Sequence, residues 1–472
     1  MVKKIKKITC IGAGYVGGPT MAVIANNCEF LDITVVDLNI ERINSWNSDD
    51  LLKLPVYEPG LDQIIKKCRG RNLFFSNEVE KNIAQADLIF LCVNTPVKSK
   101  GIGAGEASDL KWIESSARQV AKYAQGETIV VEKSTIPVKT AETIKTILDS
   151  TAREFLIEGN EKNFYVLSNP EFLAEGTAIN DLENPERVLI GGDNNEATEA
   201  LASIYKNWIQ DKKIIRTNLW SSELSKLTAN AFLAQRISSI NTISALCERT
   251  GAHVNEVKKA IGLDSRIGRK FLNAGPGFGG SCFKKDILNL VYLCDYYNLN
   301  EVANYWRKVI EINEWQQKRI IRLILDKLFG TLTKKKISIL GFAFKSNTND
   351  TRESPAINIC KDLIAEGANL HIYDPKVSPN QIATELKINQ TESDLNSDLG
   401  TWCFADSINE SIKNSHCVVI ITEWKEFMEI DWYFAAKEML KPAWIFDTRG
   451  VANKDIVKAA GLNIWCIGNG NV

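Results

Sequence analysis

Several features that would assign a function quickly are scarce in this sequence. Only three of its 472 residues are histidines, His253, His371 and His416, and they lie far apart in the chain. This scarcity argues against a histidine-ligated metal centre, so we predict no metal site, and it makes a histidine-dependent dehydrogenase awkward. Lysine and arginine number 57 against 58 acidic residues, a net charge of −1. No overall positive field would therefore attract nucleic acid or an anionic membrane.

Long apolar runs and paired cysteines are also missing from the sequence. No stretch approaches the roughly 18–20 apolar residues that a membrane-spanning helix needs, and the eleven cysteines include no CxxC pair. An odd cysteine count without paired spacing favours a reducing compartment over a disulfide framework. The basic leader MVKKIKK and the stretch after it resemble a signal peptide, but Gly12, Gly14, Gly17 and Pro19 interrupt that stretch. We therefore expect a cytoplasmic protein with no nucleic-acid and no membrane partner.

What the chain does contain is a repeated alternation of short β-branched runs and amphipathic stretches. Apolar residues make up 44 % of the 472 residues, and this length exceeds what one hydrophobic core usually organises. The alternation fills residues 1–217 and resumes in residues 331–472, which predicts an α/β fold with parallel sheets covered by helices. Residues 218–330 between them have a helical texture. These three ranges are the predicted domains.

The middle range contains the pattern of one long helix. No strand signal interrupts the sequence from about Ser221 to Gly251, where the glycine predicts the helix end. One apolar stripe recurs there at steps of three and four residues, through Leu233, Ile237, Ile240, Ile243 and Cys247.

A glycine-rich turn near the N-terminus carries the first functional signal. The strand candidate IKKITCI leads directly into GAGYVG at residues 12–17, and Asp37 ends the next strand candidate. Glycines at this spacing allow a tight turn, a close approach of the backbone to a pyrophosphate, and close packing of the following helix. A carboxylate at Asp37 would accept hydrogen bonds from ribose hydroxyls and repel a 2′-phosphate. The pattern therefore predicts NAD rather than NADP.

Three further polar segments stand where strands are expected to end: VNTP at residues 93–96, EKST at 132–135 and SNPEF at 168–172. Ligands of open α/β sheets bind beyond the carboxyl ends of the strands, although ordinary turns use the same residue types. Within the third segment, Pro170 predicts the first position of a helix. Glu171 and Glu175 would then share one helix face, where acids either satisfy the helix dipole or act on a ligand.

The segment GPGFGGSCFKKD at residues 275–286 is the most informative in the chain. Its glycines predict a loop whose backbone can approach a ligand closely. The loop delivers Cys282 where a helical pattern resumes, and a helix N-terminus favours the nucleophilic thiolate. Asp286 lies one helical turn further on and could act as a base. Lys226 and Asn230 begin an otherwise apolar helical row, which fits either the stabilisation of an oxyanion or a helix end that emerges into solvent.

These motifs together resemble the UDP-glucose 6-dehydrogenases of the UDP-glucose/GDP-mannose dehydrogenase family. They occur in family order over nearly the whole chain: GAGYVGGPT, VNTP, VEKST, SNPEFLAEG, WSSELSKLTANAFLAQR, DSRIG, GFGGSCFKKD, GFAFK, DTRES and FDTRG. The segments WSSELSK and SNPEFLAEG look closer to the animal-type enzymes than to many bacterial relatives. The resemblance implies two Rossmann-like, doubly wound parallel-sheet lobes, joined by a central helical region whose long helix also forms a homodimer. It implies the NAD-dependent, four-electron oxidation of UDP-glucose to UDP-glucuronate by a homo-oligomer.

The resemblance also implies roles for individual residues. Cys282 would capture the C6 aldehyde as a thiohemiacetal, which a second hydride transfer converts to a thioester. Lys226 and Asn230 would stabilise charge on oxygen, Asp286 and a water would transfer protons, and Glu171 would assist hydrolysis of the thioester. The implied catalytic set is Cys282, Lys226, Asn230, Asp286, Glu171 and Thr135.

Two sets of binding residues follow from the same resemblance. Cofactor contacts are expected from Gly12, Ala13, Gly14, Tyr15, Val16, Gly17, Asp37, Arg42, Val93, Asn94, Thr95, Pro96, Val97, Ser134, Thr135, Glu175, Cys282, Phe283, Lys284, Lys285 and Arg352. Substrate contacts are expected from Glu171, Phe172, Leu173, Ala174, Glu175, Lys226, Asn230, Arg266, Asn273, Ala274, Gly275, Pro276, Gly277, Phe278, Gly279, Phe344, Lys345 and Arg449. In the family the arginine of DSRIG, here Arg266, reaches into the site of a neighbouring subunit.

Two other functions are open. A GDP-mannose or UDP-N-acetyl-hexosamine dehydrogenase would share the scaffold and the cysteine, and turnover on the three nucleotide sugars would distinguish them. A nucleotide sensor that binds NAD without chemistry is the alternative from another class, and the intact set of Cys282, Lys226 and Asp286 argues against it.

Overall fold

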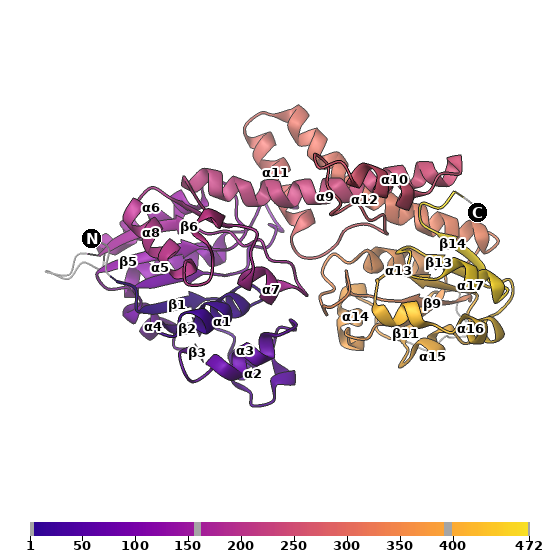
Figure 1. The fold of residues 1–472 in the computed structure, drawn as a ribbon, viewed down its shortest axis with the longest axis horizontal. Coiled ribbons are helices and arrows are strands. Elements are labelled where there is room, and N and C mark those ends of the chain that lie inside the picture. The colour runs from indigo at the N-terminus through magenta and orange to yellow at the C-terminus, as the bar shows by residue number, and fades with distance from the viewer. Residues whose placement is uncertain (1–3, 155–161, 391–398, 471–472) are drawn as a thin grey trace. The chain divides into compact units, whose positions relative to one another are not determined.

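The computed structural model describes residues 4–154, 162–390 and 399–470. The chain forms two compact units (Figure 1). One comprises residues 1–229 and 288–298, and the other residues 230–287 and 299–472. The boundary therefore falls within the long helix α9 (Leu219–Thr250) and again within α11 (Phe283–Tyr296).

The first unit is built on an eight-stranded sheet with the order β3-β2-β1-β4-β5-β6-β7-β8. All neighbouring strands pair in parallel except β6 and β7. The strands are β1 (Lys7–Ile11), β2 (Asp32–Val36), β3 (Leu73–Ser76), β4 (Leu88–Leu91), β5 (Glu127–Glu132), β6 (Asn163–Ser168), β7 (Val188–Gly192) and β8 (Ile214–Thr217). The central strands are buried on both faces, as a parallel sheet between helices requires.

Helices cover this sheet and enclose two apolar clusters that include residues of its central strands. They are α1 (Gly17–Asn27), α2 (Ile40–Asn47), α3 (Leu61–Cys68), α4 (Val79–Gln85), α5 (Lys111–Tyr123), α6 (Thr140–Glu154), α7 (Ala178–Glu183) and α8 (Asn195–Tyr205). The antiparallel step from β6 to β7 departs from the predicted parallel sheet. Its connection contains only the short α7, which packs against α1, so the chain enters β7 from the opposite end.

The second unit contains a six-stranded, wholly parallel sheet with the order β11-β10-β9-β12-β13-β14. Its strands are β9 (Lys336–Leu340), β10 (Asn369–Tyr373), β11 (Thr401–Phe404), β12 (Cys417–Ile420), β13 (Trp444–Asp447) and β14 (Asn463–Cys466). Its helices are α10 (Val254–Gly262), α12 (Asn300–Lys327), α13 (Pro355–Ala365), α14 (Pro379–Leu386), α15 (Ile408–Ile412), α16 (Trp432–Glu438) and α17 (Lys454–Ala459). Both sheets are doubly wound, which confirms the predicted α/β class with two Rossmann-like lobes and a central helical region.

The long central helix exists as predicted, and its apolar stripe is buried only in part, at Ile240 and Cys247. Leu233 and Ile237 are only half-buried, and Ile243 is exposed. The buried positions in the second half of α9 include Ser238 and Asn241, whose side chains hydrogen-bond to backbone groups of other segments. Small and polar residues let neighbouring segments approach the helix closely there, so apolar periodicity alone located only part of the buried face.

Candidate functional site

The glycine turn before α1 has the geometry of a pyrophosphate cradle. Gly12 has φ +110°, and a Cβ there would lie 2.4 Å from the carbonyl oxygen of Cys92. A Cβ at Gly17 would lie 2.0 Å from the carbonyl oxygen of Gly12, whereas a Cβ at Gly14 would meet nothing within 4 Å. Gly12 and Gly17 therefore serve packing, while Gly14 leaves its side of the turn open for a ligand. Because α1 begins at Gly17, the positive end of its helix dipole lies at this turn, which favours a phosphate there.

Asp37 is held beside this turn at the end of β2. Its Oδ2 accepts a hydrogen bond from the Ala13 N–H at 2.9 Å and pairs with Arg42 Nη1 at 3.1 Å, and its Oδ1 accepts from the Asn39 N–H. The carboxylate remains 13 % exposed. The residues present therefore fit an adenine dinucleotide whose ribose lies against a fixed carboxylate.

Two of the predicted strand-end segments meet in the structure. The Ser134 hydroxyl donates to the carbonyl oxygen of Val93 at 2.7 Å, and the Thr95 hydroxyl donates to that of Thr135 at 2.8 Å. These bonds join the ends of the neighbouring strands β4 and β5. The sheet thus brings the segments 93–97 and 133–135 to one edge, where the nicotinamide end of a dinucleotide would lie.

The third segment is not a helix, which corrects the expectation for Glu171 and Glu175. Residues 169–177 form an irregular loop, and α7 begins only at Ala178. The Glu171 Oε1 atom accepts hydrogen bonds from the N–H groups of Phe172 and Leu173 at 2.7 and 2.9 Å. These local bonds offer the backbone an alternative to a helical turn, so the two acids do not share a helix face.

Glu171 instead forms a buried ion pair with Lys133, a residue that the sequence reasoning did not select. The Lys133 Nζ atom lies 2.9 Å from Glu171 Oε2, and the lysine side chain is only 3 % exposed. It also donates to Asn169 Oδ1 at 3.2 Å, and the Tyr205 hydroxyl donates to the same oxygen at 2.6 Å. Lys133 stands inside the EKST motif, so its position, though not its partner, was visible in the sequence.

The protonation states of this pair follow from its surroundings. Burial by itself would raise the pKa of Glu171, but the ammonium groups of Lys133 and Lys226 outweigh it and hold that pKa below its usual range. Burial would likewise lower the pKa of Lys133, and the Glu171 carboxylate outweighs it and raises that pKa. Both groups are therefore charged at neutral pH.

Lys226 lies on the same side of the first unit. Its ammonium is 5.4 Å from the centre of the Phe172 ring, and the guanidinium carbon of Arg187 is 4.0 Å from that ring. Lys226 is 7 % exposed and Asn230 is 6 % exposed, so the polar start of the helical row is buried. The alternative of a helix end that emerges into solvent is therefore excluded.

The predicted nucleophile lies in the second unit. Cys282 is half-buried immediately before α11, and its Sγ atom lies 3.5 Å from the Ser281 hydroxyl. Asp286, on the first turn of that helix, is 1 % exposed, and its Oδ2 accepts a hydrogen bond from Asn230 Nδ2 at 2.5 Å. Asn230 therefore fixes the rotamer of the carboxylate that the sequence placed one turn from the thiol.

The glycine-rich loop before Cys282 is anchored by side-chain amides. Asn241 Oδ1 accepts from the Gly275 N–H at 2.9 Å, and Asn313 Oδ1 accepts from the Phe278 N–H at 2.7 Å. A Cβ at Gly279 would lie 2.4 Å from the carbonyl oxygen of Glu353. The loop is therefore rigid and packed against the DTRES segment, and its glycines permit that close approach.

Of the residues expected to bind the sugar nucleotide, those in the second unit lie on or beside this loop with one exception. Arg449 donates to the carbonyl oxygens of Ile421 and Phe344 at 2.7 and 3.2 Å and pairs with Glu423. The Lys345 ammonium lies 5.4 Å from the Phe344 ring centre. The exception is Arg266, whose side chain is 86 % exposed and pairs only locally, with Asp264.

The predicted site thus falls into one set in each unit. The first unit holds Gly12, Ala13, Gly14, Tyr15, Val16, Gly17, Asp37, Arg42, Val93, Asn94, Thr95, Pro96, Val97, Ser134, Thr135, Glu171, Phe172, Leu173, Ala174, Glu175 and Lys226. The second unit holds Asn230, Arg266, Asn273, Ala274, Gly275, Pro276, Gly277, Phe278, Gly279, Cys282, Phe283, Lys284, Lys285, Asp286, Phe344, Lys345, Arg352 and Arg449. Lys226 of the first set and Asn230 of the second set both lie on helix α9. No other two residues from different sets are closer in sequence.

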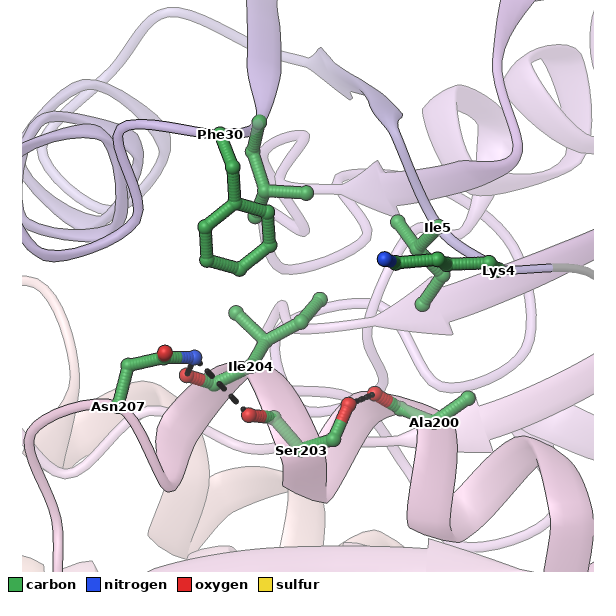
Figure 2. A pocket seen from close by; sticks show the side chains of 8 residues that line it. Lys4, Ile5, Phe30, Ala200, Ser203, Ile204 and Asn207 are labelled. Atoms are coloured by element: carbon green, nitrogen blue, oxygen red, sulfur yellow. Dashed lines mark hydrogen bonds between the residues drawn. The ribbon is translucent and has the colours of Figure 1, made fainter.

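A cavity of about 360 Å³ in the first unit lies outside this site (Figure 2). Its lining includes Phe30, Ile204, Ser203 and Asn207, and none of the predicted site residues. The Ser203 hydroxyl and the Asn207 amide both donate to carbonyl oxygens of α8, as Figure 2 shows, so these donors are already used. Across residues 4–154, 162–390 and 399–470 no cluster of three or more His, Cys, Asp or Glu could hold a metal ion. Among the helices of that described part, none is long and apolar enough to cross a membrane.

Comparisons with known proteins agree over the whole chain. Three models of the UDP-glucose/GDP-mannose dehydrogenase family match: the NAD binding domain at residues 6–209, the central domain at 220–315 and the UDP binding domain at 338–454. The chain is 55 % identical to UDP-glucose 6-dehydrogenase of Bos taurus, over 98 % of this chain and 93 % of the relative. It is 52 % identical to UDP-glucose 6-dehydrogenase 3 of Oryza sativa subsp. japonica, over 98 % and 97 %. A solved UDP-glucose dehydrogenase from Pyrobaculum islandicum is similar with a TM-score of 0.82 at 27 % identity, over 98 % of this chain and 97 % of that one.

Proposed function

Because this chain belongs to the UDP-glucose/GDP-mannose dehydrogenase family, we propose that it oxidises UDP-glucose to UDP-glucuronate with two NAD⁺. The observation that carries this proposal is the full-length identity of 52–55 % to UDP-glucose 6-dehydrogenases, together with an open dinucleotide turn and a half-buried cysteine behind a glycine loop. Residues 1–217 would bind NAD, residues 218–330 would form the dimer, and residues 331–472 would bind the UDP-sugar.

NAD⁺, when bound, accepts one hydride in each of the two oxidations. The chain's own residues supply the remaining chemistry. The Cys282 thiolate adds to the C6 aldehyde and gives a thiohemiacetal, whose oxidation leaves a thioester on the same sulfur. Water then attacks the thioester carbonyl, so that the carboxylate is released and the thiol is regenerated.

Charged and polar side chains would control oxygen and proton positions in these steps. The buried Lys226 ammonium and the Asn230 amide suit an oxygen on which negative charge develops. The Asn230 amide also orients Asp286, which suits proton transfer through a water. Glu171 is held as a carboxylate by Lys133, which suits the orientation of the hydrolytic water.

The test of this function is the yield of NADH from purified protein with limiting UDP-glucose and excess NAD⁺. Two NADH for each UDP-glucose are expected, with UDP-glucuronate as the product. Parallel assays with GDP-mannose and UDP-N-acetyl-hexosamines test the related activity. A solved UDP-D-ManNAc dehydrogenase from Pyrococcus horikoshii shares the fold with a TM-score of 0.82 at 26 % identity, which favours including that sugar. NADH formation with none of the sugars would leave a nucleotide-binding sensor.

The active form would be a homodimer or a higher homo-oligomer. Helix α9 exposes large apolar side chains, among them Phe232 at 55 % and Leu246 at 59 %, and the half-buried stripe of Leu233 and Ile237 runs along the same helix. A second copy of the chain would cover these residues. The protein would act in the cytoplasm, because a nucleophilic Cys282 must stay reduced.

A further inference from the structure

A buried carboxylate that the proposed mechanism does not use lies on α9, one turn before Lys226. Glu223 is 2 % exposed. Its Oε2 atom accepts a hydrogen bond from the Lys139 N–H and its Oε1 atom accepts one from the Ala141 N–H, both at 2.7 Å. Because α6 begins at Thr140, these donors belong to the start of that helix. Glu223 thus caps α6 from another helix, more than 80 residues away in sequence.

The segment capped in this way carries site residues. Residues 133–141 run from the end of β5 to the first turn of α6 and contain Lys133, Ser134 and Thr135. The first part of the segment is fixed by the Lys133–Glu171 ion pair and by the bonds to the segment 93–97. The last part is fixed by Glu223. Lys139, whose N–H is one of the two groups that Glu223 binds, has φ +76°, a conformation that a residue other than glycine keeps only when its surroundings impose it.

Stability does not explain why this cap is charged. Burial raises the pKa of Glu223 to about 7, although three backbone N–H groups oppose the shift. Two other acids face it, Glu132 at the end of β5 and Glu142 on α6. Since the folded pKa is above the ordinary value, the folded state holds more protons between pH 4.5 and 7, and ionisation of Glu223 destabilises the protein as pH rises through that window.

The two oxygens of a carboxylate, however, give a geometry that an amide cannot. They accept from two backbone N–H groups at once, whereas a glutamine has a single acceptor oxygen and would point a donor at the second N–H. We propose that Glu223 is a positioning residue, whose carboxylate fixes the segment 133–141 to the helix that carries Lys226. The inference rests on the proposed function only in that UDP-glucose oxidation is one of its readouts.

The test compares Glu223→Gln with wild type. The variant should lower kcat roughly 10- to 100-fold, the effect of a misplacement near 1 Å, and should weaken NAD binding in calorimetry because Ser134 and Thr135 move. In wild type, kcat should increase with pH as Glu223 loses its proton near pH 7. This rise in the plot of kcat against pH, the pH limb, should be missing in the variant. A role in stability alone would change the melting temperature and leave that limb in place.

Two further variants keep the proposal falsifiable. Glu142→Gln removes a neighbouring charge from the exposed face of α6 and should leave the maximal kcat and the NAD affinity unchanged. The pH limb should remain and move to lower pH, because the Glu142 carboxylate repels that of Glu223. Glu223→Asp keeps the charge but shortens the side chain, so kcat should fall while the pH limb remains. If the Glu223→Gln protein does not fold, Glu223→Asp takes its place in the test. Wild-type kcat and pH profile in Glu223→Gln, or in Glu223→Asp where that stands in, would overturn the positioning role. A wild-type protein that forms no NADH would contradict the proposed function instead.

Discussion

Cys282 differs from the other cysteines in its surroundings rather than in its chemistry. Eight of the eleven thiols are buried, among them Cys360 and Cys417, whose pKa burial raises, whereas Cys282 is half-buried just before α11 and behind a packed loop. Burial of a thiol in apolar surroundings opposes formation of the thiolate, so the buried cysteines are inert packing residues. The placement of Cys282 leaves it able to reach an aldehyde.

The first prediction separates the two oxidations at this residue. Cys282→Ala should lower UDP-glucuronate formation by roughly three orders of magnitude or more, because no covalent intermediate can form. The variant should still reduce the UDP-linked C6 aldehyde to the alcohol with NADH, since that step needs no thiol. Cys466→Ala is the control, because Cys466 is also half-buried, but on β14, and burial raises its pKa to about 12. Acid formation at the wild-type rate in Cys282→Ala would refute the covalent route.

The second prediction concerns the Lys133–Glu171 pair. Lys133→Met should leave the Glu171 carboxylate buried without its partner and should lower the free energy of unfolding by about 3–5 kcal/mol. Lys133→Met combined with Glu171→Leu should regain most of this loss. The control is Lys81→Met, whose pair with Glu78 is more than half exposed on both sides and should contribute nothing measurable. Urea unfolding at pH 7 measures all three, and equal midpoints for wild type and Lys133→Met would contradict the buried pair.

The third prediction tests the Lys133–Glu171 pair independently, through the pH dependence of stability. Because the folded pKa of Glu171 is lowered, the unfolded state binds more protons below the ordinary glutamate value of 4.5. The stabilisation from this carboxylate is therefore present at neutral pH and is lost as pH falls below 4.5. Glu171→Gln should show a shallower loss of unfolding free energy from pH 5 to pH 3 than wild type. Identical slopes would mean that Lys133 does not hold the carboxylate in the folded state.

At the scale of elements, the regular alternation of strand and helix patterns made the fold predictable from the sequence. The elements that the sequence did not predict correctly depend on tertiary contacts. Thirteen of the fourteen strands in the described residues coincide with short β-branched or apolar runs of the sequence. Such runs are expected because strands of a parallel sheet are buried between helices. The fourteenth strand, β8, is largely exposed after its first residue, so its sequence gave no apolar signal. The predicted helix at Glu171 is absent because Lys133, just after the end of β5, and two local N–H groups engage the Glu171 carboxylate.

The same division holds within the site. Motif spacing located Asp37, Lys226 and Cys282, since each depends on the position of a strand end or a helix start. Lys133 and Glu223 act on partners distant in sequence, 38 and more than 80 residues away, and local spacing contains no information about such partners. Only the folded sheet brings them together.

Asp37 gives a prediction for the first βα unit as an element. The carboxylate links the end of β2 to the glycine turn through the Ala13 N–H, so Asp37→Ala removes both a ribose acceptor and a support of the turn. NAD affinity should fall roughly 10- to 100-fold, the effect of losing a charge-assisted hydrogen bond, and NADP should be discriminated against less strongly. Asp32→Ala, at the exposed opposite end of the same strand, is the matched control. Calorimetry with both cofactors measures the change, and unaltered affinity for each would exclude the ribose role.

The whole molecule raises the question of what Arg266 does. Its guanidinium is 86 % exposed and engages only Asp264, two residues away, so within its own unit it approaches no other predicted site residue by a described hydrogen bond or ion pair. An isologous dimer would place the same residue of each copy against the other copy. If Arg266 completes the neighbouring site, an Arg266 defect in one subunit and a Cys282 defect in the other fall in the same site of a mixed dimer, and the second site stays intact.

This arrangement predicts complementation between two inactive proteins. Arg266→Ala should raise the KM for UDP-glucose strongly, and Cys282→Ala should form no acid. A heterodimer of the two, isolated by tandem purification through two different tags, would contain one subunit with an intact Cys282 that faces an intact Arg266. Such a heterodimer should recover about half of the wild-type activity, because one of its two sites is complete. If Arg266 served its own subunit, each site would keep one defect and the heterodimer would remain as impaired as its parents. Tandem-purified wild-type dimers carrying the same tags set the scale, and a monomeric Arg266→Ala protein that binds UDP-glucose with wild-type affinity would exclude the shared site.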